Sequence, residues 1–183
     1  MTASHDSSTR QKFLIALRVI VVVTFLIGAF RATFFTVYRV SGSSMLKSLQ
    51  DGDRIFVYDP PFTQPEVSVG DTVVLEVDGE ILVKRVLAAP GDRIEMVYGH
   101  VVRNGWAVPE HIGVDRRSYD WLPETEMTED QFFVLGDHRR VSVDSREFGP
   151  VTREQLLGVV ALRAPDGGGL GLISDTQVRR PNL

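Results

Sequence analysis

The chain has 183 residues, a formal net charge of −4, and hydrophobic residues at 43% of its positions. This length suits one domain of ordinary size with a short appendage, and the mild negative charge argues against a nucleic-acid partner, which usually needs a clustered basic surface. The lack of cysteine excludes disulfides, thiolate metal sites and a cysteine nucleophile, while the four histidines are too scattered for zinc ligation.

The N-terminal region predicts a membrane anchor. Met1 to Arg10 is polar and rich in Ser and Thr, which is typical of a disordered tail. Phe13 to Phe30 is apolar apart from Arg18 and Thr24. Eighteen helical residues cover about 27 Å, close to the roughly 30 Å of a bilayer core. We therefore predict a tail at 1–12, a transmembrane helix at 13–35 and a domain at 36–183.

The charges around the apolar segment predict its orientation. Arg10, Lys12 and Arg18 lie on its N-terminal side, so the positive-inside rule places the N-terminus in the cytoplasm and the domain outside. A cleaved secretory signal is the alternative, because Val19 to Phe30 alone has the length of a signal-peptide core. No clean small-x-small cleavage site precedes the first motif, which favours an anchor that is retained. A buried core helix fits the one-sided charges poorly.

After this segment the pattern changes to short β-type runs separated by Gly, Pro and Asp, which predicts an all-β domain. The predicted strands are Arg54–Tyr58, Thr72–Val77, Glu80–Leu87, Ile94–Tyr98, Val101–Arg103, Trp106–Val108, Gln131–Leu135 and Val159–Arg163. Asp78-Gly79 and Asn104-Gly105 predict two-residue hairpin turns. Pro109 to Asp130 predicts a loop-rich insertion, and Gly167 to Gly169 begin a glycine-rich tail that we expect to be mobile.

The segment Ser41-Gly42-Ser43-Ser44-Met45 is the first candidate site. A serine nucleophile needs a base within hydrogen-bond reach and donors for the oxyanion. Gly42 and the serines favour a tight turn whose backbone N–H groups can point at a substrate carbonyl. Taken alone, this pattern fits an ordinary polar loop better than a nucleophile, so the interpretation depends on a base.

Lys84 is the candidate base. In the strand after Asp78-Gly79, alternation places Leu82, Lys84 and Val86 on one face, so the lysine is expected to be desolvated. Burial disfavours the ammonium and lowers a lysine pKa, which makes a usable base near neutral pH. An edge-strand lysine that prevents strand pairing is the alternative, and this pattern alone favours it.

A third segment is crowded with charge: Asp137, Arg139, Ser142, Asp144 and Arg146 follow one predicted strand. Such a run usually means a solvated loop with weak ion pairs. The alternative is a framework in which bidentate arginine–carboxylate pairs hold the loop that orients a catalytic group.

Ser44-Met45-Leu46-Lys47 also matches the S-x-x-K pattern of penicillin-binding proteins and class A β-lactamases. Those enzymes need S-D-N and K-T-G elements, which do not occur in this sequence, and a longer mixed α/β domain. We therefore set this interpretation aside.

Taken together, these segments resemble bacterial type I signal peptidase, the Ser-Lys membrane protease that removes signal peptides from exported preproteins. The resemblance covers nearly the whole chain in the same order. It rests on Val40–Leu49, Gly52–Val57, Lys84–Asp92, and Gly136–Arg146 followed by Phe148–Val151. Four such segments behind an N-terminal anchor are highly specific. Together they outweigh the alternatives of a polar loop, an edge-strand lysine and a solvated charged loop.

The resemblance implies residue roles. Ser44 would attack the scissile carbonyl, and its backbone N–H, with Gly42, would bind the oxyanion. Lys84 would be the general base, and Ser142 would hydrogen-bond and orient it. Asp144 and Arg146 would support that loop, with Asp137 as a further carboxylate partner. Shallow apolar pockets for small substrate residues at −1 and −3 would be formed by Tyr38, Val40, Met45, Leu82 and Val83.

The implied fold is mainly β: an antiparallel, barrel-like catalytic domain with a small inserted β region at 93–130, behind one transmembrane helix. The implied partners are preproteins, the bilayer of the cytoplasmic membrane and the secretion machinery, with no metal or organic cofactor. Lys47 and Ser48 depart from the family's usual Pro-Thr, and His138 from its asparagine. Val141 replaces a residue that is commonly polar.

Three competing hypotheses remain. A self-cleaving repressor-type Ser-Lys protease shares the fold, but that class carries a DNA-binding domain and no anchor. A specialised peptidase for few substrates, such as pilins, fits the altered segment around Lys47. An inert membrane-tethered accessory protein would be signalled by loss of Ser44 or Lys84, and both are present.

Overall fold

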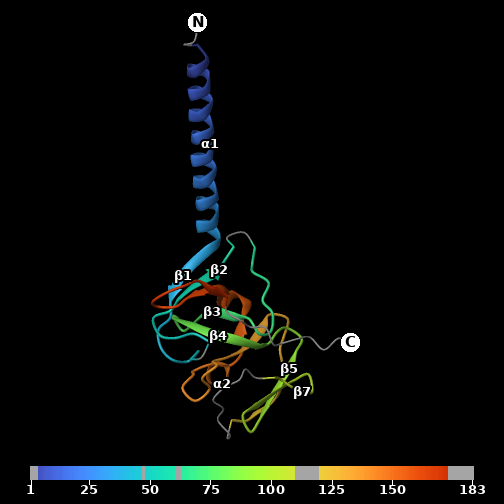
Figure 1. The fold of residues 1–183 in the computed structure, drawn as a ribbon. Helices are drawn as coiled ribbons and strands as arrows, with labels where there is room; N and C mark the ends of the chain where they lie inside the picture. The colour runs from blue at the N-terminus through green and yellow to red at the C-terminus, as the bar shows by residue number, and fades with distance from the viewer. Residues whose placement is uncertain (1–3, 47, 61–62, 110–119, 173–183) are drawn as a thin grey trace.

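The computed structural model describes residues 4–46, 48–60, 63–109 and 120–172. A long N-terminal helix, α1 (Ser4–Phe34), projects from a β domain built of antiparallel sheets (Figure 1). Within the described residues, one sheet has eight strands and the other has four. The mainly antiparallel β architecture behind an N-terminal apolar helix, which the sequence predicts, is confirmed.

Helix α1 differs from the predicted anchor at both ends. It begins at Ser4, so the described part of the predicted disordered tail is helical instead. Extending an existing helix costs little once its first turn has formed, which explains the longer helix. At the other end, Phe35 belongs to β1 (Phe35–Arg39) and not to the anchor. The aromatic and β-branched run of β1 favours a strand.

The apolar side chains of α1 between Arg10 and Gly28 are not buried by any described part of the protein. The segment Arg10–Gly28 has 19 residues and a mean hydropathy of 2.0, enough in length and composition to cross a membrane. Its large apolar side chains, such as Phe13 and Phe25, are exposed. A helix that is apolar all round needs a protein core or a lipid environment, and the described residues provide no such core.

The larger sheet holds most of the predicted strands. Its strand order is β1, β2 (Arg54–Tyr58), β11 (Leu156–Ala164), β3 (Thr72–Val77), β4 (Glu80–Ala88), β9 (Gln131–Leu135) and β10 (Val151–Thr152), while β12 (Gly171–Leu172) pairs with β11. Strands β3 and β4 form the hairpin that Asp78-Gly79 predicts. Both turn residues have positive φ, 52° and 81°, which matches the twist of the flanking strands.

The smaller sheet is the inserted region. Its order is β7 (Trp106–Ala107), β6 (His100–Arg103), β5 (Arg93–Val97) and β8 (Leu122–Glu126). The Asn104-Gly105 turn forms as predicted, between β6 and β7. Strand β8 corrects the prediction of a loop-rich stretch from Pro109 to Asp130, part of which, 110–119, lies outside the described residues.

The remaining short elements have weak sequence signals. Helix α2 (Ser145–Phe148) and the 3-10 helix η1 (Arg153–Gln155) follow β9, on either side of β10. Strand β12 lies within the glycine-rich tail that the sequence predicts to be mobile, so Gly171 and Leu172 of that tail are held by the sheet. Two-residue strands carry too little periodicity to be recognised in sequence.

Three apolar clusters in the core fix the segments that carry the candidate site residues. The first joins the two sheets through Leu87, Met96, Phe133 and their neighbours. The second holds the loop between β1 and β2 by its buried Met45 and Leu49. The third fixes β4 against β9 through Val86 and Val134. The loop after β1, the middle of β4 and the end of β9 are thereby fixed relative to one another.

Candidate active site

Ser44 lies in the loop between β1 and β2, on a turn that the core holds firmly. Its neighbour Met45 is buried in the second cluster, as is Leu49 one helical turn later. Backbone hydrogen bonds from Leu46 to Ser43 (3.0 Å) and from Leu49 to Met45 (2.8 Å) close the turn. Two buried apolar anchors therefore leave the polar Ser44 between them at the boundary of the core.

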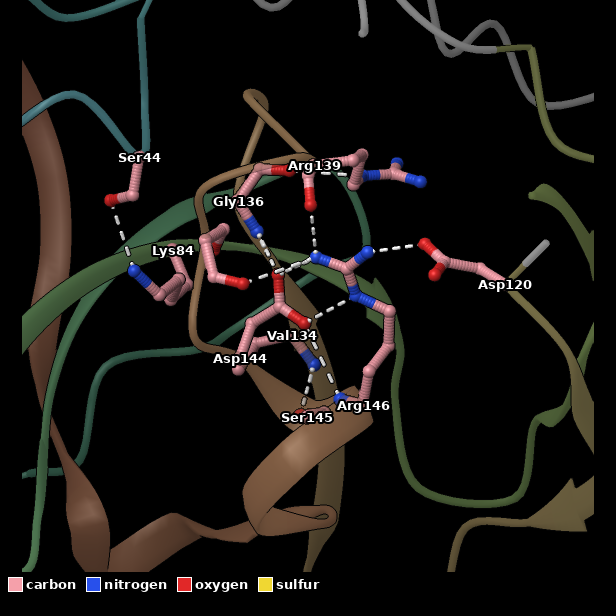
Figure 2. Close-up of polar contacts among 10 residues, drawn as sticks. Ser44, Lys84, Asp120, Val134, Gly136, Arg139, Asp144, Ser145 and Arg146 are labelled. Carbon is pink, nitrogen blue, oxygen red and sulfur yellow. Dashed lines mark hydrogen bonds and ion pairs between the residues drawn. The ribbon is translucent and has the colours of Figure 1, made fainter. Parts of the chain in front are cut away.

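Lys84 reaches Ser44 from the middle of β4. Its Nζ lies 3.0 Å from Ser44 Oγ (Figure 2), and the residue is only 2% exposed. Its neighbours on the same strand face, Leu82 and Val86, pack in the third cluster, which is the apolar setting that strand alternation predicts. The structure thus brings together the two residues on which the sequence argument depends.

The surroundings of Lys84 favour its neutral form. Burial lowers the pKa of Lys84 from its ordinary value of 10.5, because a low dielectric disfavours the ammonium. The carboxylate of Asp144 opposes this by raising the pKa, and the guanidinium of Arg146 lowers it further. The net direction is downward, so a larger share of Lys84 can accept a proton near neutral pH.

The loop after β9 closes over this pair, and Gly136 allows it to do so. A side chain at Gly136 would place its Cβ 2.2 Å from Ser142 Oγ and 2.7 Å from the Ser44 backbone oxygen, so only glycine fits. The backbone N–H of His138 donates to the same Ser44 oxygen at 2.9 Å. The loop is therefore packed directly on the nucleophile turn.

Asp144 and Arg146 hold this loop in shape, as Figure 2 shows. The Asp144 carboxylate accepts the Gly136 N–H at 2.9 Å, Arg146 Nε at 2.8 Å and Arg146 Nη2 at 2.9 Å. Arg146 Nη2 also donates to the backbone oxygens of Arg139 and Ser142. Its remaining nitrogen, Nη1, pairs with Asp120 of the inserted region. The rigid framework expected for this charged run forms.

Ser142 lies in this loop but does not make its expected hydrogen bond to Lys84. The residue is 1% exposed, and its hydroxyl has no hydrogen-bond partner among the described residues. The close packing of Ser142 against Gly136 holds the side chain by contact instead. A buried hydroxyl without a partner costs free energy.

Asp137 pairs with Arg85 in a second buried cluster. Arg85 Nε and Nη2 donate to the two Asp137 oxygens at 2.8 and 2.7 Å, and the side chains are only 5% and 7% exposed. The Ser48 hydroxyl donates to Asp137 and accepts from Arg85 Nη2. Ser48 therefore supplies the hydroxyl that a threonine would supply there, tying the nucleophile turn to the loop. Lys47 lies outside the described residues.

The two expected oxyanion donors differ in availability. The backbone N–H of Gly42 already donates to Asp51 Oδ1 at 2.9 Å, so it is not free to bind an oxyanion in this structure. The backbone N–H of Ser44 has no acceptor in the described part of the chain. Of the two, Ser44 is the donor that remains available.

The expected pocket residues fall into two groups. Tyr38, Val40, Met45 and Val83 all belong to the second cluster, beneath the nucleophile turn. Leu82 packs in the third cluster with Val86 and Phe132. Because neighbouring residues of a strand point to opposite faces, Leu82 lies on the strand face of Lys84 and Val83 lies on the other.

The described residues also lack the arrangement that a metal site needs. In the described residues, no three or more His, Asp or Glu side chains are placed to hold a metal ion. The carboxylates of the site are already bound to arginines, and the two groups at its centre are a serine hydroxyl and a lysine amine 3.0 Å apart.

The sequence model of the family described as "Signal peptidase, peptidase S26" matches this chain over residues 13–164. The chain belongs to this family. Signal peptidase I S of Bacillus subtilis (strain 168) is 32% identical over 167 residues, covering 85% of this chain and 90% of that protein. Signal peptidase IB of Staphylococcus aureus (strain COL) is 29% identical over 170 residues, covering 83% and 87%.

A solved structure of a signal peptidase I from Enterococcus faecalis V583 aligns with a TM-score of 0.46 at 22% identity. The alignment covers 54% of this chain and 99% of that one. The resemblance that the sequence shows is confirmed by the family match and the two relatives. The chain is thus an enzyme of the signal peptidase type, a serine peptidase that removes signal peptides.

Two departures from the signal peptidase pattern keep the site intact. His138 donates its backbone N–H to the Ser44 oxygen, and its Nδ1 lies 3.3 Å from the Ser43 oxygen. Val141 is 51% exposed and points away from the core. Neither residue displaces Ser44 or Lys84.

Sequence reasoning missed three residues of the site. Arg85 directly follows Lys84, and strand alternation places it on the opposite face, which could have indicated its separate carboxylate partner. Ser48 was noted only as a departure from the family pattern. Asp120 carries no local signal, because its partner Arg146 is 26 positions away and joins it only through the packing of the inserted sheet.

Proposed function

We propose that this signal peptidase works through a dyad in which Ser44 is the nucleophile and Lys84 is the general base. The observation that carries the proposal is the 3.0 Å contact between Ser44 Oγ and the nitrogen of a lysine that is almost fully buried. A serine needs a base at this distance, and a lysine needs this burial to serve as one.

The reaction runs in two halves. In the first, Lys84 takes the Ser44 proton as Oγ attacks the scissile carbonyl carbon, and the backbone N–H of Ser44 binds the resulting oxyanion. The C–N bond then breaks, the leaving amine takes the proton from Lys84, and an ester remains on Ser44. In the second half, Lys84 activates a water that hydrolyses the ester and returns the proton to Ser44.

The supporting residues have separate parts in this proposal. Asp144 and Arg146 hold the loop that carries Ser142 against the dyad, and Ser142 orients Lys84 during turnover. Asp137 acts on the nucleophile turn through Arg85 and Ser48. We propose that the cluster of Tyr38, Val40, Met45 and Val83 receives small substrate residues at −1 and −3. Leu82, which lies on the strand face of Lys84 and packs in the third cluster, is proposed to contribute to these pockets from that side.

The single apolar helix and the family indicate membrane anchoring. We propose that α1 is retained as one span of the cytoplasmic membrane, with its basic N-terminal end in the cytoplasm. The β domain then works outside that membrane on preproteins delivered by the secretion machinery. The lipid bilayer is its second partner, and no nucleic acid is involved.

Cleavage of a preprotein with a small-x-small site by the purified full chain tests this proposal. Ser44→Ala and Lys84→Ala should each abolish processing. Ser43→Ala is the matched serine control, because Ser43 is exposed and contributes only its backbone to the site, and Lys47→Ala is the lysine control. Both controls should keep most of the activity.

The same assay separates the competing functions. Full activity of Lys84→Ala would overturn the dyad, and loss of activity in Lys47→Ala together with it would restore the S-x-x-K interpretation. Cleavage of only a few preproteins by the wild-type chain would indicate a specialised peptidase. No cleavage of any preprotein would indicate an inert accessory protein of this fold.

A further inference from the structure

Asp120 belongs to the inserted region, yet its side chain pairs with a residue outside that region. It lies two residues before β8, and its backbone oxygen accepts the N–H of Gly99, in the turn that joins β5 to β6, at 2.9 Å. Two residues on, Leu122 pairs with the buried Met96. The backbone at Asp120 is therefore fixed by the insertion itself.

The Asp120 carboxylate meets Arg146, at the base of the catalytic loop (Figure 2). Both side chains are largely buried, with 12% and 10% of their surface exposed. The other guanidinium nitrogens of Arg146 are engaged by Asp144 and by the backbone oxygens of Arg139 and Ser142. Asp120 is thus the acceptor for Nη1, for which the described residues of the loop itself supply no acceptor.

From Arg146 the contacts lead to the dyad in two steps. Arg146 fixes the Asp144 carboxylate, which in turn accepts the Gly136 N–H at 2.9 Å. Gly136 packs directly against Ser142 and against the Ser44 backbone oxygen. The inserted region is therefore joined to the nucleophile turn through the largely buried side chains of Asp120, Arg146 and Asp144 and the backbone of Gly136.

We propose that Asp120 is a positioning residue of the active site: through Arg146, the inserted sheet holds the Gly136–Ser142 loop against Ser44 and Lys84. This inference rests on the proposed dyad and extends it. The insertion then contributes to the geometry of the active site, although none of its described residues has a hydrogen bond or ion pair to Ser44 or Lys84.

The charges around Arg146 predict how the loss of Asp120 would change the pKa of Lys84. Arg146 is faced by the carboxylate of Asp144 from its own loop and by that of Asp120 from the insertion. Asp144 and Arg146 are the charges that act on Lys84. With the Asp120 charge removed, the positive charge of Arg146 is less compensated, which lowers the pKa of Lys84 further.

The test compares Asp120→Asn with two controls in the full, detergent-solubilised chain. Asp120→Glu keeps the charge, and Glu124→Gln removes a carboxylate from the same sheet whose ion pair with Arg93 is half exposed. Two quantities are measured: kcat for preprotein cleavage, and the titration of Lys84 by NMR of ¹³Cε-labelled lysine. The chain has three lysines, Lys12, Lys47 and Lys84, so the signal is readily assigned.

For Asp120→Asn we expect kcat to fall about tenfold with KM little changed, as for a displaced catalytic group. The Lys84 titration should move to lower pH by a few tenths of a unit to about one unit. Asp120→Glu should leave that titration in place. Glu124→Gln should change neither quantity. A merely structural role of Asp120 would lower stability without moving the Lys84 titration.

The proposal is overturned if Asp120→Asn has the wild-type kcat and Lys84 titration, or if Glu124→Gln shifts the titration equally. If Asp120→Asn does not fold, Asp120→Ser is measured at a lower temperature with the same expectations. Failure of the dyad itself would be seen separately, as activity in Lys84→Ala, whereas failure of this inference leaves Lys84→Ala inactive.

Discussion

Two buried arginine–carboxylate clusters flank the catalytic pair, and they are built differently. In the first, Arg85 binds both oxygens of the Asp137 carboxylate, and the Ser48 hydroxyl contacts both residues. In the second, Arg146 is shared by two carboxylates, Asp144 and Asp120. The first cluster ties the nucleophile turn to the loop after β9, and the second shapes the loop itself.

The two clusters act differently on the catalytic lysine. The charges that shift the pKa of Lys84 are Asp144 and Arg146, both from the second cluster. The Arg85–Asp137 pair of the first cluster instead holds the nucleophile turn in place. Changes in the first cluster should therefore alter stability, and changes in the second should alter the pH dependence of the reaction.

The largest effect is expected from Asp137→Asn. The change leaves the Arg85 charge buried without its carboxylate, and breaking one side of such a pair costs about 3–5 kcal/mol. Denaturant unfolding of the full chain measures this. Glu124→Gln, which breaks the exposed pair with Arg93, is the control and should cost less than about 1 kcal/mol. Equal costs for the two variants would contradict the structural role of the first cluster.

Asp144→Asn should reduce kcat/KM about 100-fold, because the loop loses its charged acceptor for Gly136 and Arg146. Its pH profile should also move. Asp144 raises the pKa of Lys84, so its loss lowers that pKa. Because the reaction needs neutral Lys84, the acid limb of kcat/KM should move to lower pH. An acid limb that moves in Asp137→Asn but not in Asp144→Asn would reverse the assignment of the two clusters.

Ser48→Ala should cost about 1–2 kcal/mol in the free energy of unfolding, because Asp137 and Arg85 each lose a buried hydrogen-bond partner. Ser48→Thr keeps the hydroxyl and is the matched control, with a change below about 0.5 kcal/mol. Neither change should move the acid limb. An unchanged stability in Ser48→Ala would mean that the hydroxyl is not part of the first cluster.

The smallest effect on stability is expected from Ser142→Ala. Its hydroxyl is buried without a partner among the described residues, so removing it should change stability by no more than about 1 kcal/mol, in either direction. If Ser142 orients Lys84 during turnover, kcat should fall about tenfold while KM stays constant. A wild-type kcat would remove Ser142 from the proposed mechanism.

Strong local patterns made most of the fold predictable from the sequence. Alternation and turn residues located β2, β3 and β9 at their observed bounds, and Asp78-Gly79 identified the central hairpin. Strand β8 could not be recognised, because its sequence Leu-Pro-Glu-Thr-Glu has neither apolar alternation nor β-branched residues beyond one threonine. It is a strand because β5 offers it an edge to pair with.

The site was predictable where a residue's role follows from its own strand. Lys84 could be singled out because Leu82 and Val86 share its face. The interactions across the fold could not be predicted in this way. The Gly42 N–H is taken by Asp51 nine residues later, and the Asp120–Arg146 contact needs two sheets packed together. Charge pairs of this kind depend on tertiary packing and leave no periodic signal in the sequence.

The central claim is that Lys84 is neutral when it accepts the Ser44 proton, and its own titration tests this most directly. The full chain labelled with ¹³Cε-lysine has three lysines to observe, and Lys84→Arg removes the signal of one. We predict that this signal titrates below the ordinary lysine value of 10.5, in the direction that burial sets. A Lys84 signal that titrates at or above that value would contradict the account.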